Sequence, residues 1–262
     1  MKLTILSLLA ALLFTVPLVA QDAASDARKP TLFLIGDSTV KNGAKGQVGW
    51  GTVIGHYFDD QKIRVENRAL GGRSSRSYLR EGLWDKVLAE LQPGDFVIMQ
   101  FGHNDNGPLD AEKARASVKG NGDEAQEVTI KETGVKETVH SYGWYLRNYI
   151  DGTKSKGATP IVCSLVPRNL WVDGKVTRAS NDFAKWAREA AQQGGASFID
   201  LNEIIGSRYD TEGEQKVASE YFTTIDHTHT NQTGAEVNAA CVVEGIRSLK
   251  ECPLREYLQP DR

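Results

Sequence analysis

The sequence has few cysteines, little charge imbalance and, beyond its first twenty residues, no long apolar run. Three cysteines in 262 residues exclude a disulfide-rich scaffold, and no Cys-x-x-Cys pair or Cys/His cluster indicates zinc. Lysine and arginine number 31 against 34 aspartates and glutamates, so the net charge of −3 argues against a nucleic-acid partner. Past residue 20 no stretch is long enough to predict a membrane span.

The three cysteines, Cys163, Cys241 and Cys252, cannot all pair within one chain. Cys163 lies in the apolar run PIVCSLV, which is typical of a buried strand. One continuous helix would hold Cys241 and Cys252 about 16 Å apart, so these two could pair only if the helix between them breaks. We interpret all three as structural and leave a Cys241–Cys252 disulfide open.

Residues 1–20 carry one lysine, then an apolar stretch, then Pro17 and a small residue, Ala20, before a polar segment over 21–30. This order is typical of a secretory signal peptide cleaved after Ala20, which predicts a secreted or periplasmic protein with no membrane association after cleavage. An uncleaved membrane anchor is the alternative, because about eighteen apolar residues could just span a bilayer.

Over 31–262 short apolar runs alternate with helical stretches. Strands are predicted at 31–36, 62–69, 95–102, 159–166 and 196–201, and helices near 50–60, 80–91, 141–156, 180–193, 202–221 and 233–249. Most of the strands are continuously apolar, as in a parallel sheet that is covered on both faces. The fold class is therefore α/β, a three-layer α/β/α sandwich with a five-stranded parallel sheet in a single domain.

Residues 107–140 interrupt this alternation. The segment EVTIKETGVKETVH predicts a β-hairpin that turns near Glu132–Gly134. Because the excursion follows the carboxyl end of the third strand, where such sheets place their sites, we expect it to form a wall or lid of the active site. A surface decoration is the alternative.

Several familiar catalytic motifs are absent: there is no G-x-S-x-G elbow, Walker A loop, G-x-G-x-x-G after a strand or H-E-x-x-H. What remains is polar residues at the predicted strand ends. Ser38 follows the first strand in GDST, where it could be a nucleophile or merely a helix cap. Gly71-Gly72 follows the second strand, and Asn104, in GHND after the third, could donate to a developing oxyanion or hold a loop.

Asp226 and His229 lie three residues apart near the C-terminus. In a helical turn the carboxylate could accept from imidazole Nδ1 and leave Nε2 as a general base. His227 would then point elsewhere, and His103 could compete as the base only with Asp105 as its partner. His56 and His140 are interpreted as packing or surface residues.

Taken together, GDST, the glycine turn, GHND and Asp-x-x-His resemble the SGNH (GDSL-type) hydrolases over essentially the whole chain after residue 20. The resemblance implies a flavodoxin-like fold, serine-dependent acyl transfer and no metal or organic cofactor. It implies catalysis by Ser38, His229 and Asp226, with an oxyanion hole formed by the Ser38 and Gly72 N–H groups and the Asn104 side chain. Gly72 is preferred because it directly precedes Arg73, as in related sequences reading GRS, and Gly71 is the alternative.

Within that family the segments NRALGGRSSRSY, FGHNDNGPLD, HSYGWYLR and KGATPIVCSLVPR most resemble rhamnogalacturonan acetylesterases. The implied substrate is an acetylated poly- or oligosaccharide of pectin, deacetylated through an acetyl-enzyme. Alternatives are another acetylated glycan such as xylan, a lipid esterase, or a catalytically silent carbohydrate-binding protein. An anionic polymer would favour nearby cations and aromatic rings that stack on sugars, and the candidates for these roles are Arg73, Arg76, Arg80, Trp50, Tyr78 and Trp171.

Overall fold

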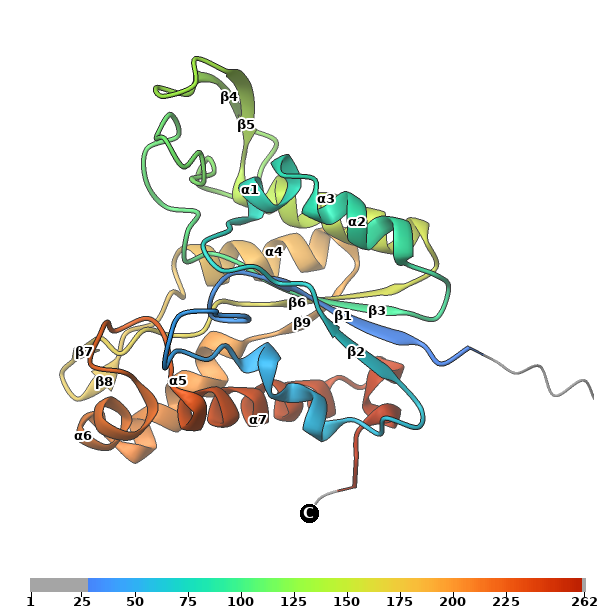
Figure 1. Ribbon diagram of the computed structural model, residues 1–262, viewed down its shortest axis with the longest axis vertical. Coiled ribbons are helices and arrows are strands. Elements are labelled where there is room, and N and C mark those ends of the chain that lie inside the picture. The colour runs from blue at the N-terminus through green and yellow to red at the C-terminus, as the bar shows by residue number, and fades with distance from the viewer. Residues whose placement is uncertain (1–27, 261–262) are drawn as a thin grey trace, which may run out of the picture.

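A computed structural model describes residues 28–260, so the predicted signal peptide over 1–20 lies outside the described residues. One sheet of five parallel strands forms the centre of the molecule, in the order β2-β1-β3-β6-β9 (Figure 1). This is the flavodoxin-like order, and it confirms the predicted fold class. The strands are β1 (Thr31–Gly36), β2 (Arg64–Asn67), β3 (Phe96–Gln100), β6 (Thr159–Cys163) and β9 (Ser197–Ile199).

The continuous apolar runs arise because both faces of the sheet are covered. Along β1, Leu32 and Leu34 point into one core while Phe33 and Ile35 point into the other, and all four are buried. One core packs against α5 (Leu201–Glu212) and α7 (Gln232–Ser248), and the other against α2 (Leu83–Glu90), α3 (Tyr142–Ser155) and α4 (Phe183–Gly194) (Figure 1).

The helices follow the predicted positions with local differences. The stretch near 50–60 forms two 3-10 turns, η1 (Trp50–Thr52) and η2 (Ile54–Tyr57), instead of one helix. The stretch over 202–221 divides into α5, a short α6 (Glu214–Lys216) and a π-helical turn, η3 (Val217–Tyr221). Three further elements were not anticipated from the sequence, and they are α1 (Ser75–Arg80), η4 (Pro253–Tyr257) and the two-stranded ribbon of β7 (Trp171–Val172) with β8 (Lys175–Val176).

The excursion over 107–140 contains the expected hairpin, with β4 (Ala125–Thr129) antiparallel to β5 (Lys136–His140). The hairpin projects away from the sheet at the side toward which the parallel strands run (upper left in Figure 1). The part of the excursion that precedes β4 instead lies against the loop after β3, where it contributes to the site.

Cys163, Cys241 and Cys252 are all buried and unpaired. Helix α7 ends at Ser248, so the break needed for a Cys241–Cys252 disulfide is present, yet no disulfide forms. Within residues 28–260 no helix is long and apolar enough to cross a membrane.

Candidate active site

Ser38 lies in a tight turn directly after β1, at the carboxyl edge of the sheet. The backbone carbonyl of Asp37 accepts from the N–H groups of Val40 and Lys41 at 3.2 and 3.1 Å, which closes the turn. The Asp37 carboxylate accepts from both the N–H and the hydroxyl of Thr39, at 2.8 and 2.7 Å. These buried contacts fix the backbone on both sides of Ser38, whose side chain remains partly exposed.

Further buried polar contacts, made by Gln100, hold this turn against the sheet. The amide of Gln100, at the end of β3, donates to the Thr39 hydroxyl at 2.7 Å and accepts from Trp50 Nε1 at 2.8 Å. Trp50 is fully buried, so its ring serves the packing beneath the nucleophile. The turn is therefore preorganised by the first and third strands together.

Ser38, His229 and Asp226 form a hydrogen-bonded line. Ser38 Oγ lies 2.8 Å from His229 Nε2, and His229 Nδ1 lies 2.8 Å from Asp226 Oδ2. The three residues come from opposite ends of the chain, 191 residues apart between serine and histidine. With Nδ1–H donating to the carboxylate, Nε2 presents its lone pair to the serine hydroxyl, which is the arrangement a general base needs.

Asp226 is held in a loop and not in the helical turn that the sequence analysis considered. Its Oδ1 accepts from the N–H groups of Thr228 and His229 at 2.7 and 2.8 Å, and its Oδ2 also accepts from Gln47 Nε2 at 2.9 Å. Partial burial opposes the ionised carboxylate, but the hydrogen bonds from the His229 ring and the two N–H groups outweigh it and hold the pKa of Asp226 well below its ordinary value. The Asp226 carboxylate therefore stays ionised next to the His229 imidazole.

The glycine turn packs directly against the nucleophile. Arg73 N–H donates to the Leu70 carbonyl at 3.3 Å, and Gly72 has φ +78°, so residues 70–73 form a turn whose third position favours glycine. A Cβ added at Gly71 would lie 3.5 Å from the Ser38 Cβ. Within the described part of the chain, the N–H groups of Ser38 and Gly72 donate to no protein acceptor, which leaves both able to bind an oxyanion.

Asn104 lies in the loop after β3, and its amide is held at both ends. Nδ2 donates to the Arg73 carbonyl at 2.9 Å, and Oδ1 accepts from Arg115 Nη1 at 2.9 Å. The same Arg115 nitrogen donates to the Gly72 carbonyl at 3.1 Å. The second Nδ2 hydrogen is left for a ligand.

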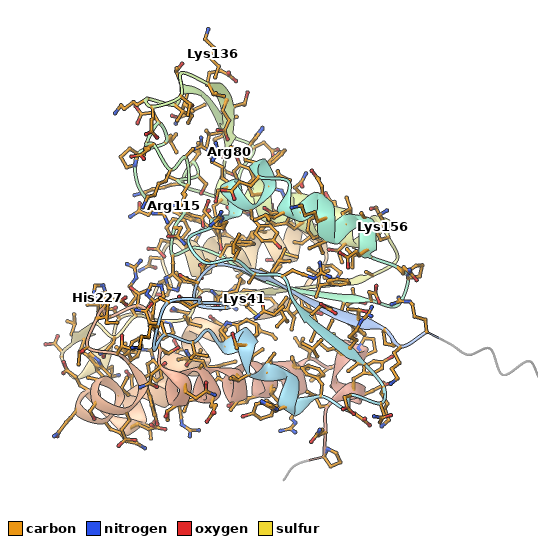
Figure 2. The ribbon with its side chains drawn as sticks, in the orientation of Figure 1. Lys41, Arg80, Arg115, Lys136, Lys156 and His227 are labelled. Atoms are coloured by element: carbon orange, nitrogen blue, oxygen red, sulfur yellow. The ribbon has the colours of Figure 1, made fainter. Side chains whose placement is uncertain are left out.

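Sequence reasoning missed Arg115, which reaches the site from the excursion. Its only sequence signal is the position of residues 107–140 after the third strand, which does not single out one residue. Figure 2 shows Lys41, Arg115 and His227, from three separate segments, toward the side where the carboxyl ends of the strands lie.

For three residues the prediction of substrate binding is wrong, because their side chains are buried inside the protein. Trp50 lies beneath the Ser38 turn, as described above, and the Tyr78 hydroxyl donates to the Arg68 carbonyl within the core on the other face. Arg76 is fully buried and forms a two-pronged ion pair with Glu137. Arg73 is one-third exposed and pairs with Glu81 at 2.9 Å.

The remaining histidines are not placed as bases. Burial lowers the pKa of His103 to about 4, so its ring is neutral. His227 is exposed, and His140 stacks on Trp144 with ring centres 3.8 Å apart. In the described range, 28–260, no group of three or more metal-binding side chains occurs.

The comparisons with known proteins agree with this geometry. Residues 34–237 match the model of the GDSL-like lipase/acylhydrolase family. A rhamnogalacturonan acetylesterase of Emericella nidulans is 35% identical over 88% of this chain and 91% of its own length. A probable rhamnogalacturonan acetylesterase of Bacillus subtilis, YesY, is 30% identical over 88% of this chain and 98% of its own.

Solved structures share the fold. The protein YXIM of Bacillus subtilis superposes with a TM-score of 0.67 at 24% identity, over 84% of this chain and 56% of that one. An acetylxylan esterase of Geobacillus stearothermophilus superposes with a TM-score of 0.52 at 16% identity, over 83% of this chain and 94% of its own. The resemblance stated from the sequence and the predicted enzyme class are confirmed: the chain belongs to the GDSL-like lipase/acylhydrolase family.

Proposed function

We propose that this protein is a serine esterase that removes acetyl groups from rhamnogalacturonan through an acetyl-enzyme intermediate. The observation that carries the proposal is the line of Ser38, His229 and Asp226, with 2.8 Å at each of its two contacts. The family match and the two rhamnogalacturonan acetylesterase relatives support a carbohydrate acetylesterase. The choice of rhamnogalacturonan over another acetylated glycan rests on those relatives.

The first half-reaction forms the acetyl-enzyme. As Ser38 Oγ attacks the acetyl carbonyl, His229 Nε2 accepts the hydroxyl proton, and the resulting imidazolium is stabilised by the Asp226 carboxylate. Collapse of the tetrahedral intermediate breaks the bond to the sugar oxygen, which takes the proton from His229. The product of this step is the free sugar hydroxyl.

The second half-reaction returns the enzyme to its starting state. Water attacks the acetyl carbonyl while His229 accepts its proton, and acetate leaves as Ser38 regains a hydrogen. In both steps the negative oxygen would bind to the N–H groups of Ser38 and Gly72 and to Asn104 Nδ2, which are fixed before the reaction by the turn and the Arg115 contact.

We also propose that the chain is exported and loses residues 1–20. The support comes from the sequence alone, in the order of a charged start, an apolar stretch and a small residue before the cleavage position. Export fits a polymer substrate, which a cell meets outside its membrane.

The test measures acetate release by residues 21–262 from acetylated rhamnogalacturonan and from acetyl-xylan, beside the Ser38→Ala variant. We expect release from rhamnogalacturonan and near-complete loss in the variant, because the oxyanion donors alone cannot supply a nucleophile. Ser155→Ala, an exposed serine on α3, is the matched control. A preference for acetyl-xylan would refute the assigned polymer, and an active Ser38→Ala variant would refute the mechanism.

A further inference from the structure

A cavity of about 350 Å³ opens beside the loop that carries Asn104. It lies past the carboxyl ends of β3 and β6, where ligands bind in open α/β sheets. Its polar lining comprises one carboxylate, Asp182, together with His103, Asn106, Arg168, Thr177, Arg178 and Asn202. The cavity has the size of a small-ligand site, and the mechanism above leaves it unused.

Arg168 is the unusual member of this lining. Within residues 28–260 its guanidinium forms no ion pair, and its Nε is buried without a hydrogen-bond partner. Its one hydrogen bond to the described residues is a long one, 3.4 Å from Nη2 to the His103 carbonyl. Arg168 as a whole is partly buried, and removing even part of a cation from water without a counter-charge is unfavourable, so the arrangement favours an anionic ligand here.

The position of Arg168 links the cavity to both catalytic loops. The His103 carbonyl that it contacts immediately precedes Asn104 in the sequence. The neighbouring Asn169 donates its N–H to the carbonyl of His227 at 2.8 Å, inside the loop that carries the base. A group bound by Arg168 would therefore lie between the loop of Asn104 and the loop that contains His227 and His229.

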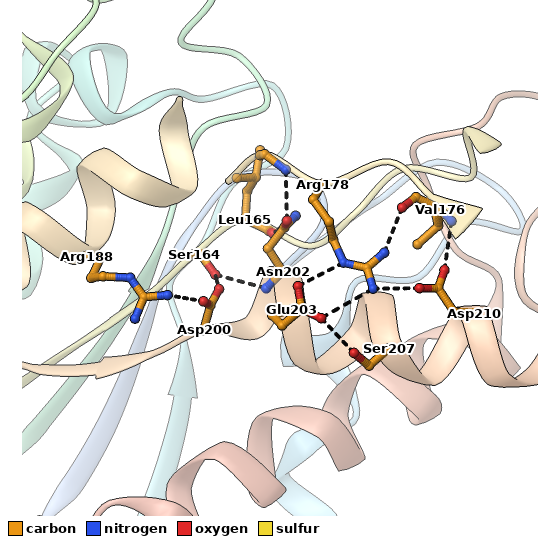
Figure 3. Close-up of polar contacts among 11 residues, drawn as sticks. Ser164, Leu165, Val176, Arg178, Arg188, Asp200, Asn202, Glu203, Ser207 and Asp210 are labelled. Carbon is orange, nitrogen blue, oxygen red and sulfur yellow. Dashed lines mark hydrogen bonds and ion pairs between the residues drawn. The ribbon is translucent and has the colours of Figure 1, made fainter. Parts of the chain in front are cut away.

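The other arginine of the cavity is already satisfied. Arg178 donates to Glu203 at 3.1 Å, to Asp210 at 2.9 Å and to the Val176 carbonyl at 2.7 Å (Figure 3). These contacts tie the segment after β8 to α5 and make Arg178 part of the wall. Asp182, an exposed carboxylate of the lining, accepts the N–H of Phe183 and does not pair with either arginine.

Resting on the proposed function, we propose that this cavity is a subsite for a uronate residue of the substrate and that Arg168 binds its carboxylate. The planar guanidinium matches a carboxylate with two parallel N–H···O bonds. The neutral His103 ring adds no charge, and Thr177 and Asn106 supply donors and acceptors for sugar hydroxyls. Two of the three cations that the sequence suggested for this role, Arg73 and Arg76, are instead paired with Glu81 and Glu137.

The test compares two polymers with the same acetyl groups: acetylated rhamnogalacturonan, and the same polymer with its uronate carboxyls reduced to alcohols. The readout is selectivity, defined as kcat/KM on the acidic polymer divided by kcat/KM on the reduced one. We expect Arg168→Gln to lower selectivity by about 10- to 100-fold, the range of a charge-assisted hydrogen bond. Arg168→Lys keeps the charge but loses the paired N–H donors of the guanidinium, so its selectivity should lie between those of the wild type and Arg168→Gln.

The control is Arg255→Gln, which removes one exposed charge and should keep wild-type selectivity. Arg255 lies in η4, whose Tyr257 packs against Phe96 at the start of β3, so it is at the opposite end of the sheet. Because selectivity is a ratio measured on one protein preparation, a partly unfolded variant lowers both rates and leaves the ratio intact. Equal losses on the two polymers in Arg168→Gln, or a wild type without preference for the acidic polymer, would overturn the subsite alone. A wild type active on acetyl-xylan and on neither rhamnogalacturonan polymer would overturn the proposed function as well.

Discussion

At the scale of single residues, Arg115 connects two of the three candidate oxyanion donors. One nitrogen of its guanidinium donates to the Gly72 carbonyl and to Asn104 Oδ1. The contact with Oδ1 fixes which way the Asn104 amide points, and a cation on the amide oxygen makes the amide N–H a stronger donor. In the proposed mechanism, Arg115 is therefore a positioning residue that would act through Asn104.

We expect Arg115→Ala to lower kcat by about 10- to 100-fold with a smaller change in KM, on p-nitrophenyl acetate as well as on polymers. Asn104→Ala should lower kcat by roughly 10²–10³-fold, as is found for other oxyanion donors. If Arg115 acts through Asn104, the double variant loses little more than Asn104→Ala alone, which a double-mutant cycle measures.

The matched control for Arg115 is Lys113→Ala, an exposed cation two residues away in the same segment that forms no hydrogen bond with Gly72 or Asn104 within residues 28–260. Fully additive losses in the double variant would show that Arg115 does not work through the amide. A change confined to KM would instead assign it to substrate binding.

At the scale of elements, Arg76 attaches the excursion to the sandwich. The Arg76 side chain extends from α1, and its guanidinium pairs with Glu137 on β5. The guanidinium also donates to the carbonyls of Leu109 and Ala116 at 2.8 Å each. One buried side chain thus joins the hairpin, the part of the excursion that precedes β4 and the helix that follows the glycine turn. The segment that carries Arg115 is held by this contact.

Replacing Arg76 with methionine should lower the free energy of unfolding by about 3–5 kcal/mol, because the Glu137 carboxylate and two backbone carbonyls lose their donor. Urea denaturation measures the change. Adding Glu137→Gln should recover part of the loss, since the uncompensated carboxylate is then removed.

Arg80→Met on the same helix removes an exposed cation that forms no ion pair within residues 28–260, and it should change stability by less than about 0.5 kcal/mol. Similar losses in the Arg76 and Arg80 variants would mean that the buried pair does not anchor the excursion.

At the scale of the whole molecule, a buried carboxyl group links stability to pH. Asp105 accepts hydrogen bonds from the N–H of Ser75 at 3.1 Å and from the Ser117 hydroxyl at 3.3 Å, and it also bonds the Ser75 hydroxyl. Burial raises the pKa of Asp105 to about 7, because the hydrogen bonds from Ser75 offset only part of the cost of burying the charge.

A carboxyl whose pKa is raised in the folded state favours folding at low pH, and this contribution is lost as pH rises through the folded pKa. The unfolded chain has an ordinary aspartate pKa of 3.8, so unfolding releases a proton between about pH 4 and pH 7. We expect Asp105 to lower the free energy of unfolding by roughly 2–3 kcal/mol between pH 5 and pH 8. Urea denaturation at these two pH values, with Asp105→Asn as the comparison, measures this. An equal pH dependence in both proteins would contradict the assignment.

The sequence by itself determined the layers and the reactive residue types. Continuous apolar runs such as TLFLIG require cover on both faces, and that requirement is local enough to predict the sheet without knowing its neighbours. GDST, GHND and Asp-x-x-His stand at strand ends or near the C-terminus, so Ser38, Asn104 and His229 could be named before any contact was known. What local pattern could not determine was the environment of each side chain.

The tertiary structure decided which charged and aromatic side chains are available to bind a substrate. Arg73 and Arg76 follow the glycine turn and looked available, but Glu81 and Glu137 neutralise them, and Glu137 is 61 residues from its partner. Arg115 and Arg168 look ordinary in the sequence and become distinctive because Asn104 and His103 lie beside them. Pairing and burial depend on contacts between distant segments, and for that reason only the folded chain could show them.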